Sequence, residues 1–214
     1  MSRAWPLFDL AVVTPRLRLE YATDDHLEAL AELRDGRVVR DGEEPFDGDS
    51  SFYATPPSAM WRAMTGEWGA RARTTPTWWH LSFAVLVDGD LVGQQNITAA
   101  EFPTVRTVSS FSFLDRARRG AGLGREMRAA VLHLAFAGLG ALRAESDAFA
   151  DNVASSGVSR ALGYEPNGTL LAPRPSGAAL MERFLLTRER WEERRRDDIE
   201  LVGVDDALPV LGLA

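Results

Sequence analysis

The stretch Leu114-Asp-Arg-Ala-Arg-Arg-Gly-Ala-Gly-Leu-Gly-Arg-Glu-Met127 carries the strongest fold signal in this chain. The segment before it, Val105 to Leu114, alternates in the manner of a β-strand, and one face of that strand would carry Thr107, Ser109, Phe111 and Phe113. An amphipathic helix is predicted after it, because apolar residues recur at helical spacing at Leu123, Met127, Ala130, Val131 and Leu134. The three alternate glycines therefore lie in a tight turn between a strand and a helix.

This glycine turn has the features of an anion-binding site. Gly120, Gly122 and Gly124 leave backbone N–H groups uncovered at a helix N-terminus, which carries roughly half a positive charge. Four arginines surround the turn, at Arg116, Arg118, Arg119 and Arg125. A pyrophosphate is the natural ligand for such a site. The alternative is that the glycines only make the turn and the arginines only solvate it.

Two common nucleotide motifs do not fit the same turn. A dinucleotide fingerprint needs glycine at its sixth position, where this chain has Arg125. The Walker phosphate loop needs a lysine, and this chain contains none. Another kind of nucleotide-phosphate binder stays open as an alternative.

Composition narrows the functional classes further. A chain of 214 residues predicts one domain, and 24 basic against 31 acidic residues give a net charge of −7. That charge argues against a nucleic-acid or membrane-surface partner, which would need a basic field. The absence of cysteine from the sequence excludes disulfides, thiolate metal sites and cysteine nucleophiles. No apolar run reaches the ~20 residues of a membrane span, so we expect a cytoplasmic protein.

The remaining pattern predicts one mixed α+β domain. Strand, helix and turn signals alternate along the whole chain, and a long irregular segment lies between residues 38 and 57. Strands are expected at residues 14–21, on both sides of Asp88-Gly89, and at 105–114, 142–149 and 178–187; helices are expected at residues 24–36, from 58, from 123, at 152–162 and from 187. The apolar tail, residues 199–213, is expected to cover a dimer seam or an edge of its own sheet.

Several of these motifs resemble one family. Arg119-Gly-Ala-Gly-Leu-Gly124 resembles the Arg/Gln-x-x-Gly-x-Gly/Ala signature of the GNAT acyl-CoA-dependent N-acyltransferases. Asn152-Val-Ala-Ser155, followed by Leu162-Gly-Tyr164, is similar to the Asn-x-x-Ser and Leu-Gly-Phe/Tyr pair of the RimJ/RimL branch. The opening strand, Thr14-Pro-Arg-Leu-Arg-Leu19, also resembles that branch.

The resemblance implies a GNAT fold, with a mixed, mostly antiparallel central sheet that is splayed at its middle and covered by helices on both faces. It implies an acyltransferase domain over residues 14–187, with an N-terminal extension at 1–13 and a C-terminal helix and apolar tail at 188–214. The implied activity moves an acyl group, acetyl in the first place, from acyl-CoA to a primary amine by direct attack in a ternary complex. The amine belongs to a protein N-terminus or a small molecule. A homodimer without metal is expected.

Two alternatives to this activity stay open. Succinyl-CoA or another longer acyl-CoA could be the donor, and a free carboxylate on the donor would need a dedicated arginine in the acyl pocket. A catalytically silent acyl-CoA-binding regulatory domain is the other alternative, because the catalytic base is not evident.

The resemblance also implies roles for particular residues. Phe113 and Leu114 would pair with the pantetheine amides, and Asn152 would bind the pantetheine arm. Ser155 would protonate the departing thiolate. Backbone N–H groups of the glycine turn would hold the pyrophosphate; the residues concerned are Arg119, Gly120, Ala121, Gly122, Leu123 and Gly124, with Arg125 beside them. Without the resemblance, Asn152 is a helix N-cap and Ser155 an ordinary surface hydroxyl.

The catalytic base departs from the family pattern. The RimJ/RimL pattern often carries glutamate in the strand before the glycine turn, where this chain has Ser109, Ser110 and Ser112. Glu101 and Asp147 are the carboxylates closest in sequence to the sheet centre, and Glu101 is the candidate base, although each also fits a plain surface charge. His80 and His133 are weaker candidates.

The acceptor side is marked only by composition. Five carboxylates crowd the irregular segment, and they would attract a cationic amine or simply be solvated; they are Asp41, Glu43, Glu44, Asp47 and Asp49. Four tryptophans would line the same pocket or pack in the core; they are Trp61, Trp68, Trp78 and Trp79.

Overall fold

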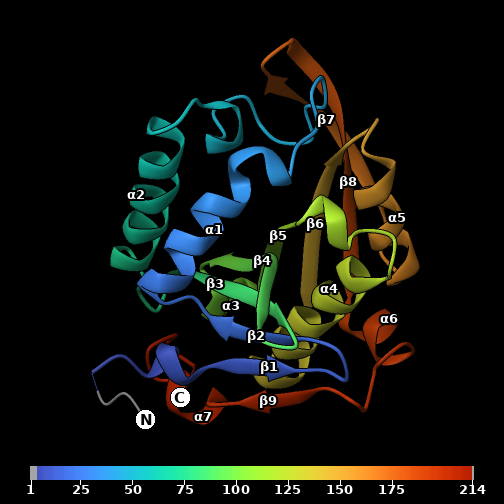
Figure 1. Ribbon diagram of the computed structural model, residues 1–214. Helices are drawn as coiled ribbons and strands as arrows, with labels where there is room; N and C mark the ends of the chain where they lie inside the picture. Colours follow the sequence, from blue (N-terminus) through green and yellow to red (C-terminus); the bar gives the residue numbers. More distant parts are fainter. Residues whose placement is uncertain (1–3, 214) are drawn as a thin grey trace.

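A computed structural model describes residues 4–213 and shows one sheet with helices on both of its faces (Figure 1). The strand order is β7-β8-β6-β5-β4-β3-β2-β1-β9. The strands are β1 (Ala11–Val13), β2 (Arg18–Tyr21), β3 (Trp78–Val87), β4 (Asp90–Ala100), β5 (Thr107–Leu114), β6 (Arg143–Phe149), β7 (Glu165–Arg174), β8 (Gly177–Thr187) and β9 (Glu200–Val202). The helices are α1 (Asp24–Arg37), α2 (Ser58–Ala72), α3 (Phe102–Val105), α4 (Leu123–His133), α5 (Val153–Ala161), α6 (Arg188–Glu192) and α7 (Val204–Ala207).

The centre of the sheet is split. β5 and β6 run parallel and pair only from Thr107 with Arg143 to Ser109 with Glu145. Beyond this point β5 continues against β4 as far as Leu114, while β6 continues against β8 as far as Phe149. All other strand pairs among residues 4–213 are antiparallel. The predicted mixed sheet, splayed at its middle, is confirmed.

Side-chain contacts show which helices cover which face of the sheet. Gln94 of β4 contacts Arg34 of α1 and Glu67 of α2, so these two helices lie on one face. Arg128 of α4 contacts Ser112 and Ser146, so α4 lies on the other face, and α5 packs beside it. Helix α4 therefore covers the split on this face of the sheet and forms the floor of the split.

The core explains why α4 forms where the sequence predicts it. Its apolar positions Leu123, Met127, Ala130 and Val131 are all buried against the sheet. Burying apolar surface stabilises the fold by about 25 cal/mol per Å², which makes this stripe a main contributor. A smaller apolar cluster holds α1 to the opposite face through Leu27, Leu30, Leu33, Val38 and Phe113.

The hairpin between β3 and β4 follows from its turn residues. Asp88 and Gly89 both adopt positive φ, 51° and 87° respectively. A two-residue turn with this geometry matches the right-handed twist of the strands it joins. The predicted Asp88-Gly89 hairpin is confirmed.

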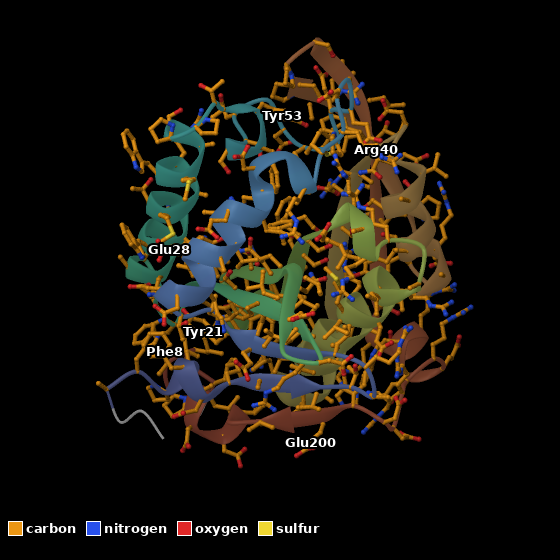
Figure 2. The ribbon with its side chains drawn as sticks, in the orientation of Figure 1. Phe8, Tyr21, Glu28, Arg40, Tyr53 and Glu200 are labelled. Atoms are coloured by element: carbon orange, nitrogen blue, oxygen red, sulfur yellow. The ribbon has the colours of Figure 1, made fainter. Side chains whose placement is uncertain are left out.

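The segments on both sides of the predicted domain join the sheet, and the sequence pattern did not predict the N-terminal one, β1. β1 pairs with β2 on one side and with β9 on the other, so the N-terminal extension and the C-terminal tail lie side by side. Phe8 packs edge-to-face on Tyr21 of β2, with ring centroids 5.8 Å apart (Figure 2). Of the two expectations for the apolar tail, β9 follows the one in which the tail covers an edge of its own sheet.

Two other elements differ from the sequence prediction. The sequence pattern does not predict β7, because Pro166, Gly168 and Pro173 interrupt its alternation. In the structure β7 forms a long hairpin with β8. The charged helix expected from residue 187 is only the short α6, whose Trp191 is buried and stacks on Phe136 with centroids 5.0 Å apart. Long-range pairing and a single aromatic anchor outweigh local propensity at these positions.

Candidate acyl-CoA site

The turn between β5 and α4 has the backbone that its glycines allow. Asp115 caps a short 3-10 turn at Arg116–Arg118 by accepting a hydrogen bond from the Ala117 amide. Gly120 and Gly122 then adopt positive φ values of 82° and 79°, a conformation that L-residues with side chains rarely adopt. The chain thereby turns sharply from the end of β5 into the first turn of α4.

The amides of this turn are unused by the protein. Across residues 4–213, no backbone or side-chain acceptor is hydrogen-bonded to the N–H groups of residues 120–125, and the first amide with a partner is that of Glu126, which donates to the carbonyl of Gly122. These six N–H groups lie at the N-terminus of α4, where the helix dipole favours a negative charge. The turn can therefore donate several hydrogen bonds to a bound phosphate.

One side of the turn is held by a buried carboxylate. Glu126 accepts hydrogen bonds from Thr14 and Arg16, each 2.6 Å long, and Arg16 also donates to the Ala121 carbonyl at 2.9 Å. Burial would raise the pKa of Glu126, but the hydrogen bonds from Thr14 and Arg16 outweigh it and leave the pKa below its usual value. The carboxylate therefore stays charged and anchors the turn.

The other side of the turn is held by Arg119. Its guanidinium donates to the carbonyls of Leu114 and Val38, which ties the turn to the C-terminal end of α1. Burial is the main cause of the lowered pKa of Arg119. Its side chain thus stabilises the turn, and its backbone N–H donates to the Arg116 carbonyl at 3.3 Å, so Arg119 does not offer the free amide that the sequence motif suggested.

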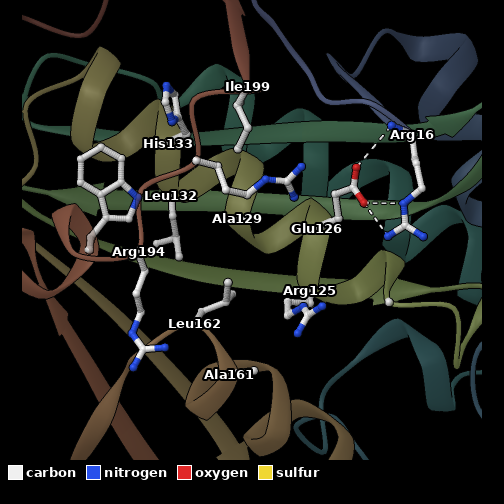
Figure 3. A pocket seen from close by; sticks show the side chains of 13 residues that line it. Arg16, Arg125, Glu126, Ala129, Leu132, His133, Ala161, Leu162, Arg194 and Ile199 are labelled. Carbon is white, nitrogen blue, oxygen red and sulfur yellow. Dashed lines mark hydrogen bonds and ion pairs between the residues drawn. The ribbon is translucent and has the colours of Figure 1, made fainter.

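Besides Arg119, two arginines around the turn have no carboxylate partner among residues 4–213. Arg118 pairs with Asp90 at 3.1 Å, whereas Arg116 and Arg125 form no ion pair within residues 4–213. Arg125 lines a pocket of about 280 Å³ between α4, the end of α5 and the C-terminal segment, and Arg194 and Arg196 also reach it (Figure 3). This pocket adjoins the turn at Gly122 and is positively charged.

Phe113 and Leu114 end the strand that borders the split. Beyond Ser109 the edge of β5 facing β6 has no strand partner among the described residues, so its backbone groups are open to a ligand. The Phe113 ring itself points to the α1 face, where it contacts Phe52 with centroids 5.0 Å apart and lies under the Arg34 guanidinium.

Asn152 and Ser155 stand across the split at the start of α5. The Asn152 side chain caps this helix, with its oxygen accepting a hydrogen bond of 3.1 Å from the Ser155 amide. The Asn152 amide nitrogen and the Ser155 hydroxyl have no hydrogen-bond partner within residues 4–213. Both groups are half-buried and can bind a ligand without breaking the cap.

The two carboxylates considered as bases lie in different places. Glu101 is exposed and follows the last residue of β4, at the closed end of the split, away from the glycine turn. This position does not support a role as the base. Asp147 lies on β6 beyond Glu145, the last β6 residue that pairs with β5. It forms an ion pair of 3.6 Å with Arg183.

A polar network on the α1 and α2 face was not predicted from the sequence. Glu67 of α2 accepts a 2.5 Å hydrogen bond from Gln94, lies 3.7 Å from Arg34, and lies 3.6 Å from Nε2 of His80. Nδ1 of His80 is 2.9 Å from the Thr98 hydroxyl. Burial raises the pKa of Glu67, but His80, Gln94 and Arg34 together lower it below its usual value.

This network borders a pocket and leads to the split. His80 and Glu67 line a cavity of about 610 Å³ beside α2. Strand register places His80 opposite Thr98, Thr98 opposite Ser109, and Ser109 opposite Glu145. These residues form one row across the sheet at the point where β5 and β6 separate. Only the register of four strands reveals that row, so no local sequence signal could have found it.

The carboxylates of the irregular segment and the four tryptophans lie in several different environments. Asp47 has its pKa raised by burial and then by the charge of Asp147, so it lies near β6 rather than free in solvent. Trp79 is fully buried in the core and Trp78 lines the pocket beside α2, whereas Trp61 and Trp68 are largely exposed.

Residues 4–213 contain neither a membrane-spanning helix nor a cluster of metal ligands. None of their helices is long and apolar enough to cross a membrane. They also contain no group of three or more His, Cys, Asp or Glu side chains arranged to hold a metal ion.

A split sheet, a turn of free amides and a helix N-terminus beside the split define an acyl-CoA-dependent transferase site. Residues 16–165 match the model of the acetyltransferase (GNAT) domain family. The chain belongs to this family and is an acyl-CoA-dependent N-acyltransferase, as the sequence motifs predicted.

Solved structures of low sequence identity share the fold. RimJ from Mycobacterium smegmatis, in complex with a CoA disulfide, is 18% identical, with a TM-score of 0.70 and 95% of each chain covered. RimL, a ribosomal L7/L12 α-N-protein acetyltransferase in complex with coenzyme A, is 17% identical, with a TM-score of 0.68, and the match covers 84% of this chain and 98% of RimL. A GNAT-family acetyltransferase from Bacillus anthracis is 14% identical, with a TM-score of 0.62, and the match covers 84% and 99% of the two chains.

Proposed function

We propose that this protein transfers an acetyl group from acetyl-CoA to the primary amine of a protein N-terminus or a small molecule. The free amides of residues 120–125, at the N-terminus of α4 and beside the open edge of β5, carry this proposal. They would hold the pyrophosphate, while Phe113 and Leu114 pair with the pantetheine and Asn152 binds its arm. The positive pocket at Arg125 and Arg194 would take the phosphorylated adenosine end.

The chemistry needs no covalent enzyme intermediate. The amine nitrogen attacks the thioester carbonyl, a carbon–nitrogen bond forms, the carbon–sulfur bond breaks, and the amine gives up one proton. The unpartnered Ser155 hydroxyl would return a proton to the CoA thiolate. An open backbone N–H on β5 would stabilise the oxyanion of the tetrahedral intermediate.

We further propose that His80 takes the proton from the amine, in place of Glu101. Thr98 and Ser109 supply hydroxyl groups in one row between His80 and the split. Asn96 Nδ2 lies 3.0 Å from His80 Nε2, and the buried Asn96 oxygen has no donor. If the Asn96 side-chain amide is flipped, its oxygen can accept a hydrogen bond from Nε2–H of His80. Nδ1 of His80 is then free to accept a proton from the Thr98 hydroxyl.

The charge around the split supports an amine acceptor. Glu145, Asp147 and the nearby Asp47 place carboxylates on the α1 and α2 face of the split. Arg183 pairs with Glu145 and Asp147. Carboxylates there favour a positively charged amine. A panel of unrelated N-terminal peptides and polyamines, assayed for CoA release, would divide the two acceptor classes.

The decisive experiment measures protection against thermal unfolding. CoA and acetyl-CoA should raise Tm, whereas ATP and NAD should not, because a ligand bound only to the folded state stabilises it. Gly122→Val should abolish the protection, because it places a β-carbon and a strained φ in the turn. Gly42 has the same φ of 79° in open space, so Gly42→Val is the matched control and should retain protection.

Contrary results would be equally clear. Protection by ATP or NAD equal to that by CoA would indicate a different nucleotide binder. CoA protection without CoA release from any donor and amine would indicate the silent regulatory domain.

A homodimer and a cytoplasmic location complete the proposal. The β7 and β8 hairpin exposes Leu171 and Leu180, which are 72% and 47% exposed, and an apolar patch of this kind supports self-association. Light scattering after size-exclusion chromatography would test the dimer. The acyl-CoA donor is an intracellular metabolite, which supports a cytoplasmic enzyme.

A further inference from the structure

The floor of the split contains a buried arginine without a carboxylate. Arg128 of α4 is 4% exposed, the lowest value of any arginine among residues 4–213. No Asp or Glu oxygen of these residues lies within 4.0 Å of its guanidinium. Its NH1 donates to the Ser146 hydroxyl at 2.9 Å and its NH2 to the Ser112 hydroxyl at 3.2 Å, while Nε has no acceptor.

This arrangement leaves a charge unbalanced. A buried cation is costly unless it is paired, and neutral hydroxyls compensate it only in part. Arg34 is also largely buried, but its guanidinium lies 3.7 Å from Glu67. Arg128 of α4 therefore differs from Arg34 of α1 in lacking an anion.

Two other buried hydroxyl groups lie beside the same guanidinium. The Tyr164 phenol and the Ser110 hydroxyl are buried beside it, and neither makes a well-formed hydrogen bond to another part of the protein. Tyr164 is close enough to Arg128 for the guanidinium to act on its pKa. Burial is the larger effect and raises the pKa of Tyr164, so its phenol remains protonated and able to donate. A guanidinium and two hydroxyl groups thus meet here without an anion.

The location of these groups is the point where the split begins. Ser109 pairs with Glu145, so Ser110 and Ser146 are the first residues beyond the paired part of β5 and β6. Arg128 bridges the two strands there, through Ser112 on one side and Ser146 on the other. A pantetheine arm that enters from the glycine turn would place its acyl end toward this apex.

We propose that Arg128, Tyr164 and Ser110 bind the free carboxylate of a dicarboxylic acyl group, so that an acyl-CoA of the succinyl type is a donor for this enzyme. The inference rests on the proposed function, since it needs acyl-CoA in the split. The planar guanidinium of Arg128, with its free Nε–H, matches a carboxylate in shape and charge. The Tyr164 phenol and the Ser110 hydroxyl would donate further hydrogen bonds to that carboxylate. An acetyl group leaves these donors without a partner.

Calorimetric titration with succinyl-CoA, butyryl-CoA and CoA tests this proposal without an acceptor amine. Succinyl and butyryl chains have the same number of carbons and differ in the terminal carboxylate. The wild-type protein should bind succinyl-CoA at least tenfold more tightly than butyryl-CoA. Arg128→Gln should bring that ratio close to one while changing the affinity for butyryl-CoA by less than threefold.

Further variants separate binding from a structural role. Arg128→Lys keeps the charge but loses the planar fork, so its ratio should be intermediate. Arg143→Gln removes an exposed arginine at the closed end of β6 and should keep the wild-type ratio. A wild-type ratio of one or below overturns the proposal, and this measurement stands even if Arg128→Gln does not fold. A ratio that survives in folded Arg128→Gln also overturns it.

The failure of the proposed function would look different. No heat with any of the three ligands would contradict acyl-CoA binding itself, and with it the carboxylate site. Equal binding of succinyl-CoA and butyryl-CoA would contradict the carboxylate site alone.

Discussion

Arg16 and Glu126 form an ion pair, with 2.5 Å between NH2 and Oε2, that joins the segment before β2 to the first turn of α4. The same guanidinium donates to Ala121 in the glycine turn. The connection between β1 and β2 therefore fixes the turn that would hold the cofactor, although about 110 residues separate the two partners in sequence. Rigid support of this kind keeps free amides in place for a phosphate.

Glu126→Gln should lower stability at neutral pH by about 1–3 kcal/mol, because Thr14 and Arg16 lose a charged acceptor. The folded pKa of Glu126 lies below its usual value, so its contribution is present above the unfolded pKa and is lost as pH falls through the folded pKa. The difference in stability between wild type and Glu126→Gln should therefore shrink below roughly pH 4. Urea unfolding at several pH values measures it.

Glu28→Gln provides the control for this prediction. Glu28 is exposed on α1 and points away from the sheet (Figure 2). Its replacement should change stability by less than about 0.5 kcal/mol at every pH. A Glu126→Gln profile parallel to that of wild type would show that Glu126 is not held ionised in the folded state.

Ser155→Ala should lower kcat by more than tenfold while leaving the thermal protection by CoA nearly unchanged. The reason is that the hydroxyl is free of protein partners, whereas the Asn152 cap that orders α5 uses only the Ser155 amide. Ser155→Thr retains a hydroxyl and should recover part of the rate. Equal losses in CoA affinity and in turnover would assign Ser155 to binding instead.

His80→Gln should lower kcat by about 10² or more, with KM for acetyl-CoA little changed, because a general base contributes on this scale. Glu67 acts through His80, so Glu67→Gln should give a smaller loss and Glu67→Asp should recover part of it. The two glutamine substitutions should be non-additive in a double-mutant cycle, because the side chains lie 3.6 Å apart. Additive losses, or full activity in His80→Gln, would remove His80 from the proton path.

Gly203→Ala should destabilise the protein, because the new β-carbon would meet the Asp9 carbonyl oxygen at 2.4 Å and Gly203 has a φ of 72°. The substitution tests whether the C-terminal tail is part of the folded domain. Gly69→Ala, in α2 with open space around it, should instead raise stability by about 0.5–1 kcal/mol. Thermal unfolding of both variants measures the contrast, and an unchanged Tm for Gly203→Ala would mean that the tail can detach at no cost.

The sequence by itself determined the local parts of this protein. The alternation before Leu114, the glycines at 120 and 122 and the apolar period of α4 predicted the strand, the turn and the helix, and all three are confirmed. The sequence also predicted Asn152 as a helix cap, because capping depends on residues only three positions apart. Each of these features is set by backbone sterics and spacing within one element.

Only the tertiary structure decided which side chains of these elements lie next to one another. The row from His80 through Thr98 to Ser109 exists because three antiparallel strands share one register, and a shift of one residue would move each side chain to the other face. Arg128 looked like an ordinary helix residue until the split placed it between β5 and β6. Its exposed fraction depends on partners 16 to 18 residues away, so no local pattern could show that a charge was buried there without its counter-ion.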